Sequence, residues 1–188
     1  IGTGNSKHVI LKNIKLINSN SNSQVGGMAI NCNCNLFLDN IKVVNNVGKY
    51  VGGIIINSGI RANINNSYFE NNKATDTKWS FGGALQNKRT LYLENNIFIN
   101  NSVSGGGGAF ANYDGGVSYL NNNSFIHNSV INGNGGAVYI NGRTDIMNCN
   151  FVDNKAKLGG AVSVESQITA RKVTISDSEF RNNLDENV

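Results

Sequence analysis

Two cysteines separated by one residue are the first side chains that could do chemistry. Cys32 and Cys34 form a C-x-C motif, and Cys149 lies far away in the chain. A C-x-C pair can contribute to a zinc site, but no second pair and no histidine cluster completes one in this sequence. Two residues two apart on a strand have a Cα separation near the upper limit for a disulfide. We therefore predict half-buried free thiols, no disulfide and no metal site.

The acidic and histidine residues are the next candidates. Polysaccharide hydrolases need paired carboxylates, and lyases need a base, often beside a carboxylate-bound calcium ion. The 12 acidic residues are dispersed along the chain, and we interpret His127, like His8, as a surface residue and not as a general base. The glycine run 105–108 lacks the Lys-Ser/Thr of a phosphate-binding loop. The sequence predicts no catalytic residues, no enzyme and no cofactor.

One segment is a candidate for ligand binding. Residues 73–81, KATDTKWSF, contain the single Trp of the chain. Trp79 is flanked by Lys78 and Phe81, and an aromatic side chain beside a cation on a protruding loop suits a ligand contact. The alternative is that Trp79 folds back over a neighbouring edge. A second irregular segment, 166–180, carries Arg171 and Lys172, which we expect to be exposed.

These candidates are carried by a repeat of about 27 residues, which is visible in three landmarks. An aliphatic or aromatic anchor recurs at Leu16, Val43, Phe69, Phe98, Phe125, Phe151 and Phe180. Three positions later the chain has Ser19, Asn46, Asn72, Asn101, Asn128, Asn154 and Asn183. A glycine pair recurs at Gly26–Gly27, Gly52–Gly53, Gly82–Gly83, Gly107–Gly108, Gly135–Gly136 and Gly159–Gly160.

The period and the local patterns predict the fold. Each repeat contains short alternating or apolar runs, such as GGAVYI, bounded by Asn, Gly and Ser. Helical repeats are longer and need stripes of period 3.6. We therefore predict an all-β protein, a parallel β-solenoid of about seven coils with three short strands per coil. It forms a single segment over residues 1–188.

Each recurring residue then has a structural role. We predict that Phe69, Phe98, Phe125, Phe151 and Phe180 form an aromatic column. The Asn three residues later forms a ladder of satisfied amides between coils. Both glycines of each pair permit a tight turn with positive φ, and the small residue that follows faces a crowded interior. Roles that recur in every coil favour scaffold over catalysis.

Composition sets further bounds. Hydrophobic residues make up 39% and charged residues 15%, and roughly one residue in five is Asn, so the chain is ordered but thinly charged. The net charge of +4 is scattered, which argues against nucleic acid as a partner. No apolar run approaches ~18 residues, so we expect no membrane span. The chain begins without Met and ends within another repeat, so we expect a segment of a longer protein.

The motifs FENN, FINN, FIHN, FVDN and FRNN, each paired with GGA or GGI, resemble a known repeat. They are similar to the Phe-x-x-Asn and Gly-Gly-Ala repeats of polymorphic outer-membrane proteins and of adhesin-like surface proteins of methanogenic archaea. The resemblance covers residues ~10–183, although the first two copies lack the aromatic anchor. It implies a right-handed parallel β-helix at the cell surface, extracellular and associated with adhesion to cell-surface glycans or proteins.

Three functions remain open. The first is an adhesin-like stalk, and the second is a structural subunit of an extracellular filament or sheath that self-associates end to end. The third is a carbohydrate-binding or carbohydrate-active β-helix. The sequence also contains N-glycosylation motifs at Asn65, Asn100 and Asn122.

Overall fold

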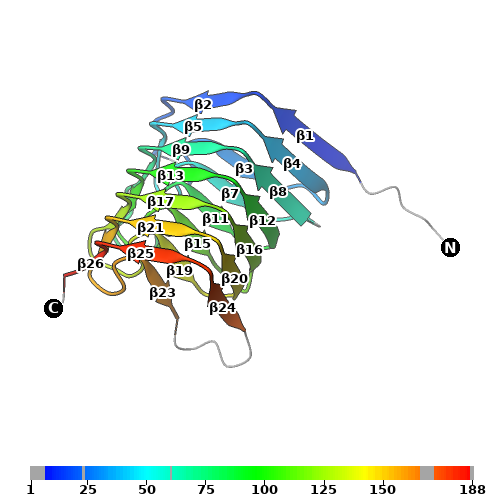
Figure 1. Cartoon of the computed structure of the whole chain (residues 1–188). Helices are drawn as coiled ribbons and strands as arrows, with labels where there is room; N and C mark the ends of the chain where they lie inside the picture. The colour runs from blue at the N-terminus through cyan, green and yellow to red at the C-terminus, as the bar shows by residue number, and fades with distance from the viewer. Residues whose placement is uncertain (1–6, 23, 60, 166–171, 187–188) are drawn as a thin grey trace.

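The chain folds into strands stacked along one axis (Figure 1). The computed structural model describes residues 7–22, 24–59, 61–165 and 172–186. Over these ranges the regular secondary structure consists of 26 β-strands with no helix. None of these residues therefore belongs to a helix that could cross a membrane.

The strands form four parallel sheets, numbered here in the order in which one coil visits them. Sheet 1 contains β1 (His8–Lys12), β4 (Asn35–Asp39), β8 (Arg61–Asn65), β12 (Thr90–Glu94), β16 (Val117–Asn121), β20 (Arg143–Met147) and β24 (Val173–Ser176). Sheet 2 contains β2 (Lys15–Ile17), β5 (Lys42–Val44), β9 (Tyr68–Glu70), β13 (Ile97–Ile99), β17 (Ser124–Ile126), β21 (Asn150–Val152) and β25 (Glu179–Arg181).

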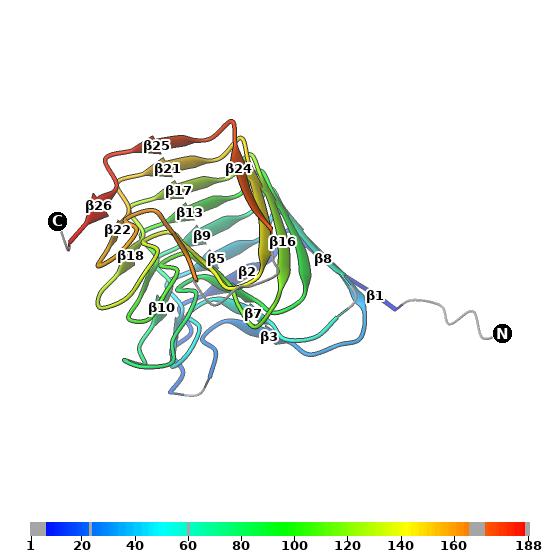
Figure 2. The same ribbon diagram turned by 90° about the horizontal axis from the view of Figure 1, so that it is seen from below.

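The other two sheets have six strands each. Sheet 3 contains β6 (Val47–Gly48), β10 (Lys73–Ala74), β14 (Ser102–Val103), β18 (Ser129–Val130), β22 (Lys155–Ala156) and β26 (Leu184–Asp185). Sheet 4 contains β3 (Met28–Ile30), β7 (Ile54–Ile56), β11 (Leu85–Asn87), β15 (Phe110–Asn112), β19 (Val138–Ile140) and β23 (Val162–Val164). Figure 2 shows sheet 2 flanked by sheets 1 and 3.

The predicted parallel β-solenoid is confirmed, with about six turns of ~27 residues. The prediction of three strands per coil is wrong, because each full coil has four. The extra strands are the two-residue strands of sheet 3. They form because the buried Asn that ends sheet 2 aligns neighbouring coils, so that the next residues also pair, as Lys73 does with Val47.

Left-handed backbone at two corners explains much of the asparagine content. The residues with φ near +50° to +58° are Asn13, Asn18, Asn40, Asn45, Asn66, Asn71, Asn95, Asn100, Asp114, Asn122, His127, Asn148, Asp153, Asp177 and Asn182. All but Asp114 lie at the corners on either side of sheet 2. Asn and Asp tolerate this conformation because their short polar side chains bond locally. His127 therefore occupies a corner position, and its ring lies 3.9 Å from the Asp153 carboxylate.

The phenylalanines of sheet 2 stack on one another inside the solenoid. Successive ring centroids from Phe69 to Phe98, Phe125, Phe151 and Phe180 are 4.5, 5.0, 4.9 and 4.6 Å apart, with interplanar angles below 10°. The first four rings are fully buried. Phe180 is 47% exposed because no described coil follows it. Aromatic stacking and burial together fix the register of adjacent coils.

The buried asparagines form a continuous ladder with every amide group paired. Asn101 is typical: its side-chain nitrogen donates to the Phe69 carbonyl and to the Asn128 side-chain oxygen, both at 3.0 Å. Its own side-chain oxygen accepts from the backbone and side-chain nitrogens of Asn72, at 3.0 and 2.9 Å. The same bonds join Asn46, Asn72, Asn101, Asn128, Asn154 and Asn183.

A second ladder lies at the other corner and was not predicted. Asn96 donates to Asn123 at 3.0 Å and to the Ile64 carbonyl at 2.8 Å. Ser67 precedes this pair along the stack, and Cys149 follows it. The sequence conceals this ladder because the residue type at the position changes from coil to coil.

The glycine pairs require a correction. The first glycine of the later pairs has positive φ, as in Gly82 at +78° and Gly135 at +71°, but Gly52 and every second glycine do not. The second glycine is needed for space instead. A Cβ added to Gly108 would lie 2.1 Å from the Gly136 carbonyl oxygen of the next coil. The following residues Ala84, Ala109 and Ala137 are fully buried, as expected for a crowded interior.

The prediction for the C-x-C motif is wrong. Cys32 and Cys34 form a disulfide, and only Cys149 is a free cysteine among the described residues. The two residues lie in the bend between β3 and β4, not on a strand, which brings their Cα atoms to 5.3 Å. That separation falls within the range that a disulfide can bridge. Lys172 is exposed, whereas the prediction for Arg171 lies outside the described residues.

Candidate ligand pocket on the outer face of sheet 4

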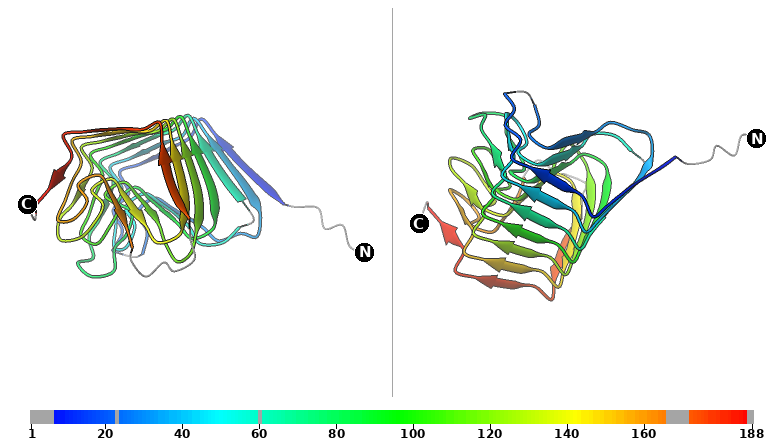
Figure 3. Two further views of the ribbon diagram at one scale, coloured as in Figure 1. Left: turned by 60° about the horizontal axis from the view of Figure 1, so that its bottom comes forward. Right: turned by 90° about the horizontal axis from the view of Figure 1, so that it is seen from above.

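The outer face of sheet 4 is buried along its middle strands, although it points away from the core. The middle residue of each strand points away from the core, because side chains alternate along a strand. In neighbouring strands these residues are Ile55, Gln86, Ala111 and Tyr139. They are 7%, 5%, 0% and 6% exposed. Chain segments between the strands project from one side of the stack (Figure 3). The segment that leads into β11 lines a pocket together with Ile55 and Gln86.

The longest of these segments, 73–81, is held in shape by Asp76. Its carboxylate accepts hydrogen bonds from the backbone nitrogens of Lys78 at 2.9 Å and Trp79 at 2.7 Å. The bond from Trp79, and then that from Lys78, lowers the pKa of Asp76 below its ordinary value. The Trp79 side chain is 68% exposed, so it does not fold back onto the coils.

A pocket of about 320 Å³ lies between this segment and the outer face of sheet 4. Ile55 and Gln86 form its floor. Tyr50, Trp79 and Phe81, which precede the strands of sheet 4, line one side. Asn57, Lys88 and Tyr113, which follow those strands, line the other side, and Gln24 and Val25 complete the lining. The volume is at the small end of the range for ligand sites, which begins at about 300 Å³.

Three polar side chains of the pocket make no hydrogen bond or ion pair with the described residues. Gln86 is 5% exposed as a whole residue, and its amide makes no hydrogen bond within the described part of the chain. Its amide atoms are not among the unpaired atoms that are shut off from solvent, so they are reached from the pocket. The amide of Asn57 and the ammonium group of Lys88 are likewise without a hydrogen bond or ion pair to described residues. An amide that solvent reaches pairs with water in the free protein and can exchange that water for a ligand hydroxyl. These groups are therefore available to a polar ligand.

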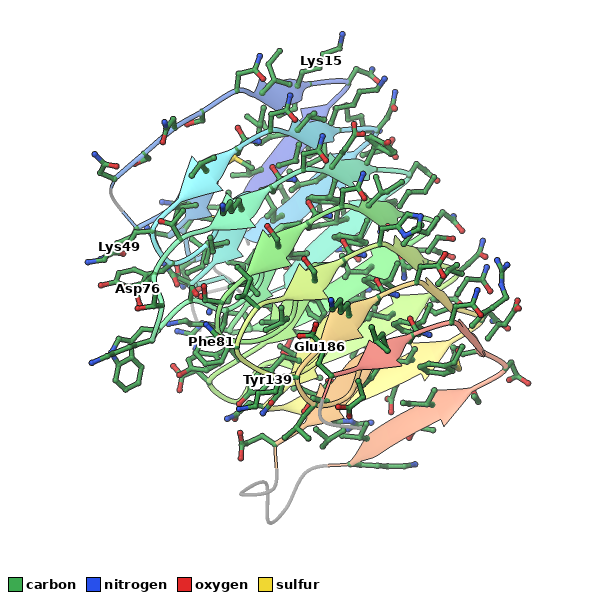
Figure 4. All side chains as sticks on the ribbon, turned by 90° about the vertical axis from the view of Figure 1, so that its left-hand side faces the viewer. Lys15, Lys49, Asp76, Phe81, Tyr139 and Glu186 are labelled. Atoms are coloured by element: carbon green, nitrogen blue, oxygen red, sulfur yellow. A yellow bond between two sulfur atoms is a disulfide. The ribbon has the colours of Figure 1, made fainter. Side chains whose placement is uncertain are left out.

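Aromatic side chains close one end of the pocket. Phe81 stacks on Tyr113 at a centroid distance of 4.6 Å and lies 5.1 Å from Tyr139. Gly106 leaves room for this cluster, since a Cβ there would lie 2.9 Å from the Tyr139 ring. The Tyr139 hydroxyl donates to Glu165 at 2.7 Å, and burial followed by this bond raises the pKa of Tyr139 well above its usual range. Figure 4 shows Phe81 and Tyr139 on the same side of the solenoid as Asp76.

The predicted binding residues are only partly brought together. Trp79 and Phe81 line the pocket, whereas Lys78 does not. The sequence reasoning missed Gln86 and Lys88, which follow the Gly82–Gly83 pair and belong to the same coil as Trp79. An amide side chain at a position where the other coils carry Ala29, Ile55, Ala111, Tyr139 or Ser163 was the available signal.

The other candidate positions lie elsewhere on the surface. Asn100 and Asn122, two of the three glycosylation motifs, are exposed at left-handed corners. Asn65 ends β8 and is partly exposed, while Ser67 of its motif is buried and donates to the Asn65 carbonyl. None of these positions contributes to the pocket.

The pocket lining contains no carboxylate, imidazole or thiol. Across the described ranges no group of three or more His, Cys, Asp or Glu side chains could hold a metal ion. The chemistry that the pocket offers consists of aromatic faces, neutral amides and one cation. That set can bind a ligand through stacking and hydrogen bonds. No protein-family model, no curated protein and no solved structure matches the chain.

Proposed function

We propose that this chain is a non-enzymatic, extracellular, adhesin-like rod that binds glycans in the pocket on sheet 4. The solenoid supplies a rigid support, and the pocket supplies the contact. The observation that carries the proposal is the Gln86 amide, which is reached from the pocket and has no hydrogen-bond partner among the described residues, between aromatic side chains.

The chemistry of sugars fits this arrangement. A pyranose ring has C–H groups on its faces and hydroxyl groups around its rim. Exposed aromatic rings such as Trp79 pack against the C–H face, and amides such as Gln86 and Asn57 can both donate to and accept from hydroxyls. A ligand without polar groups would leave the Gln86 amide unpaired, which disfavours it.

The cell-surface part of the proposal rests on the Phe-x-x-Asn and Gly-Gly-Ala repeats. These resemble the repeats of adhesin-like proteins, which implies display outside the cell and contact with partner-cell glycans or proteins. A disulfide between Cys32 and Cys34 supports an oxidising, extracellular environment.

Glycan-array binding tests the proposal. The wild-type protein is expected to bind a defined subset of glycans saturably, and Trp79→Ala is expected to lose that signal. Tyr92→Ala is the matched control, because Tyr92 stacks on Tyr119 on sheet 1 and neither residue lines the pocket. Binding that is absent in the wild type, or equal in wild type and Trp79→Ala, would contradict the proposal.

A second candidate function, a subunit of an extracellular filament or sheath, is favoured by a different observation. The last described coil exposes the apolar side chains of Val164, Ile175, Phe180 and Leu184. Unpaired strand edges with apolar side chains favour stacking on another solenoid end. Sedimentation that shows growing linear assemblies with concentration supports this function, and a monomer at all concentrations excludes it.

A further inference from the structure

The pocket has a positive charge with no neutralising partner. Lys88 is the one charged residue among the lining residues, and it forms no ion pair within the described part of the protein. Its ammonium group lies 5.7 Å from the ring centroid of Tyr113, on the wall opposite Trp79. A cation beside an aromatic ring, in the same pocket as the Gln86 and Asn57 amides, is placed to receive an anionic group.

The rim adds to this charge. The ammonium group of Lys49 lies 5.0 Å from the ring centroid of Tyr50, another lining residue, and Lys78 precedes Trp79 on the loop. Asp76 is the acidic residue of this loop, and its ionised carboxylate interacts with both Lys49 and Lys78, so it offsets one of these two positive charges and leaves the other. Figure 4 shows Lys49 and Asp76 close together at the edge of the solenoid. The field at the pocket mouth therefore favours an anion.

The pocket is closed in one direction along the solenoid. Phe81 comes from the segment before sheet 4 and Tyr113 from the turn after it, so their stacked rings span the outer face above Ala111. Tyr139 of the next coil extends this barrier. In the other direction the middle residue of β3, Ala29, is exposed. A chain can enter from that side but cannot pass through.

We propose that the pocket binds the terminal residue of an acidic glycan, with the sugar carboxylate on the Lys88 ammonium group and ring hydroxyls on Gln86 and Asn57. This inference rests on the proposed glycan-binding function and specifies its ligand class. Trp79 packs against the ring face, and the aromatic barrier stops the chain at its end.

Calorimetric titration with matched sugars tests the assignment. Galacturonic acid is expected to bind wild-type protein about tenfold more tightly than galactose, as a charge-assisted hydrogen bond predicts. Lys88→Gln should remove this preference, and Lys88→Arg should retain most of it. Lys42→Gln makes the same charge change on the exposed side of β5 and should leave the preference unchanged. Each tetragalacturonate molecule should bind one protein molecule.

Each contrary outcome is distinct. Equal binding of galactose and galacturonic acid overturns the acidic-ligand inference and leaves the glycan-binding function standing. If Lys88→Gln and Lys42→Gln lose the preference for galacturonic acid to the same extent, the effect of charge is nonspecific. That result also overturns the acidic-ligand inference. Tighter binding of galactose 6-sulfate overturns the carboxylate assignment, and several proteins per tetragalacturonate overturn terminal recognition. No binding of any sugar contradicts both the inference and the proposed function.

Discussion

The side-chain oxygen of Asn154 accepts two hydrogen bonds from Asn128, one from its backbone nitrogen at 2.9 Å and one from its side-chain amide at 3.0 Å. The Asn128 amide also donates to the Phe98 carbonyl at 3.0 Å. Each ladder member from Asn46 to Asn154 thus ties its own coil to the coil on each side, and Asn183 ties the last described coil to the one before it. Satisfied polar groups, as well as apolar packing, hold the interior of the solenoid in register.

Replacing Asn128 with Ala should be strongly destabilising. The change leaves several buried partners unpaired, each costing about 1–3 kcal/mol, so we expect a loss of at least about 2 kcal/mol in the free energy of unfolding. Urea denaturation followed by circular dichroism measures this loss. Asn132→Ala is the control, because Asn132 is exposed, and its effect should stay within about 0.5 kcal/mol. Equal midpoints for the two variants would show that the ladder does not stabilise the fold.

The cysteines should differ sharply in reactivity. Burial raises the pKa of the Cys149 thiol, and its side chain is fully buried, so a thiol reagent should not label it in the native protein. After unfolding without reductant one thiol should react, and with reductant all three cysteines should react. Mass spectrometry of the labelled protein counts them. Three labels without reductant would show that Cys32 and Cys34 are free.

Acid should loosen the Trp79 segment. The bonds from Trp79 and Lys78 lower the pKa of Asp76 in the folded protein, so they are fully formed above the ordinary Asp pKa of about 3.9. They are lost as the pH falls through the lowered value. Because Trp79 is the single Trp, its fluorescence anisotropy should be constant from neutral pH to about pH 4 and fall below it.

Asp76→Asn provides the matched variant for this titration. Asn keeps an acceptor oxygen for the two backbone nitrogens but does not titrate, so its anisotropy should not fall with pH. Far-UV circular dichroism on the same samples reports whether the coils remain folded. An identical fall in both proteins would assign the change to another group.

The scaffold could be predicted from sequence because each coil meets the same environment. Phe125 stacks between two other phenylalanines, and Asn128 bonds between two other asparagines, so both positions favour the same residue type from coil to coil. Only the first coils depart from it, with Leu16, Val43 and Ser19. Periodic spacing therefore revealed the parallel stack. The second ladder escaped notice because Ser67, Asn96 and Cys149 meet the same requirement with different side chains.

The pocket could not be predicted to the same extent. Gln86 lies at an outward position, where the repeat alone predicts solvent exposure, and its burial depends on the loop that carries Trp79. The pairing of Cys32 with Cys34 likewise depends on a local bend that the C-x-C spacing does not encode. The burial of an outward side chain by a loop and the bend between two strands depend on tertiary structure, and the repeat period does not encode them.

The glycan-binding claim is tested most directly at the side-chain amide of Gln86. An NMR titration of ¹⁵N-labelled protein with a glycan identified on the array follows this amide together with the amides of Asn57 and Asn63, the last of which lies on β8 of sheet 1. We predict that the Gln86 and Asn57 resonances shift saturably while those of Asn63 stay fixed. Saturable shifts confined to Asn63 and its neighbours on sheet 1, with Gln86 unchanged, would contradict the assignment of the pocket.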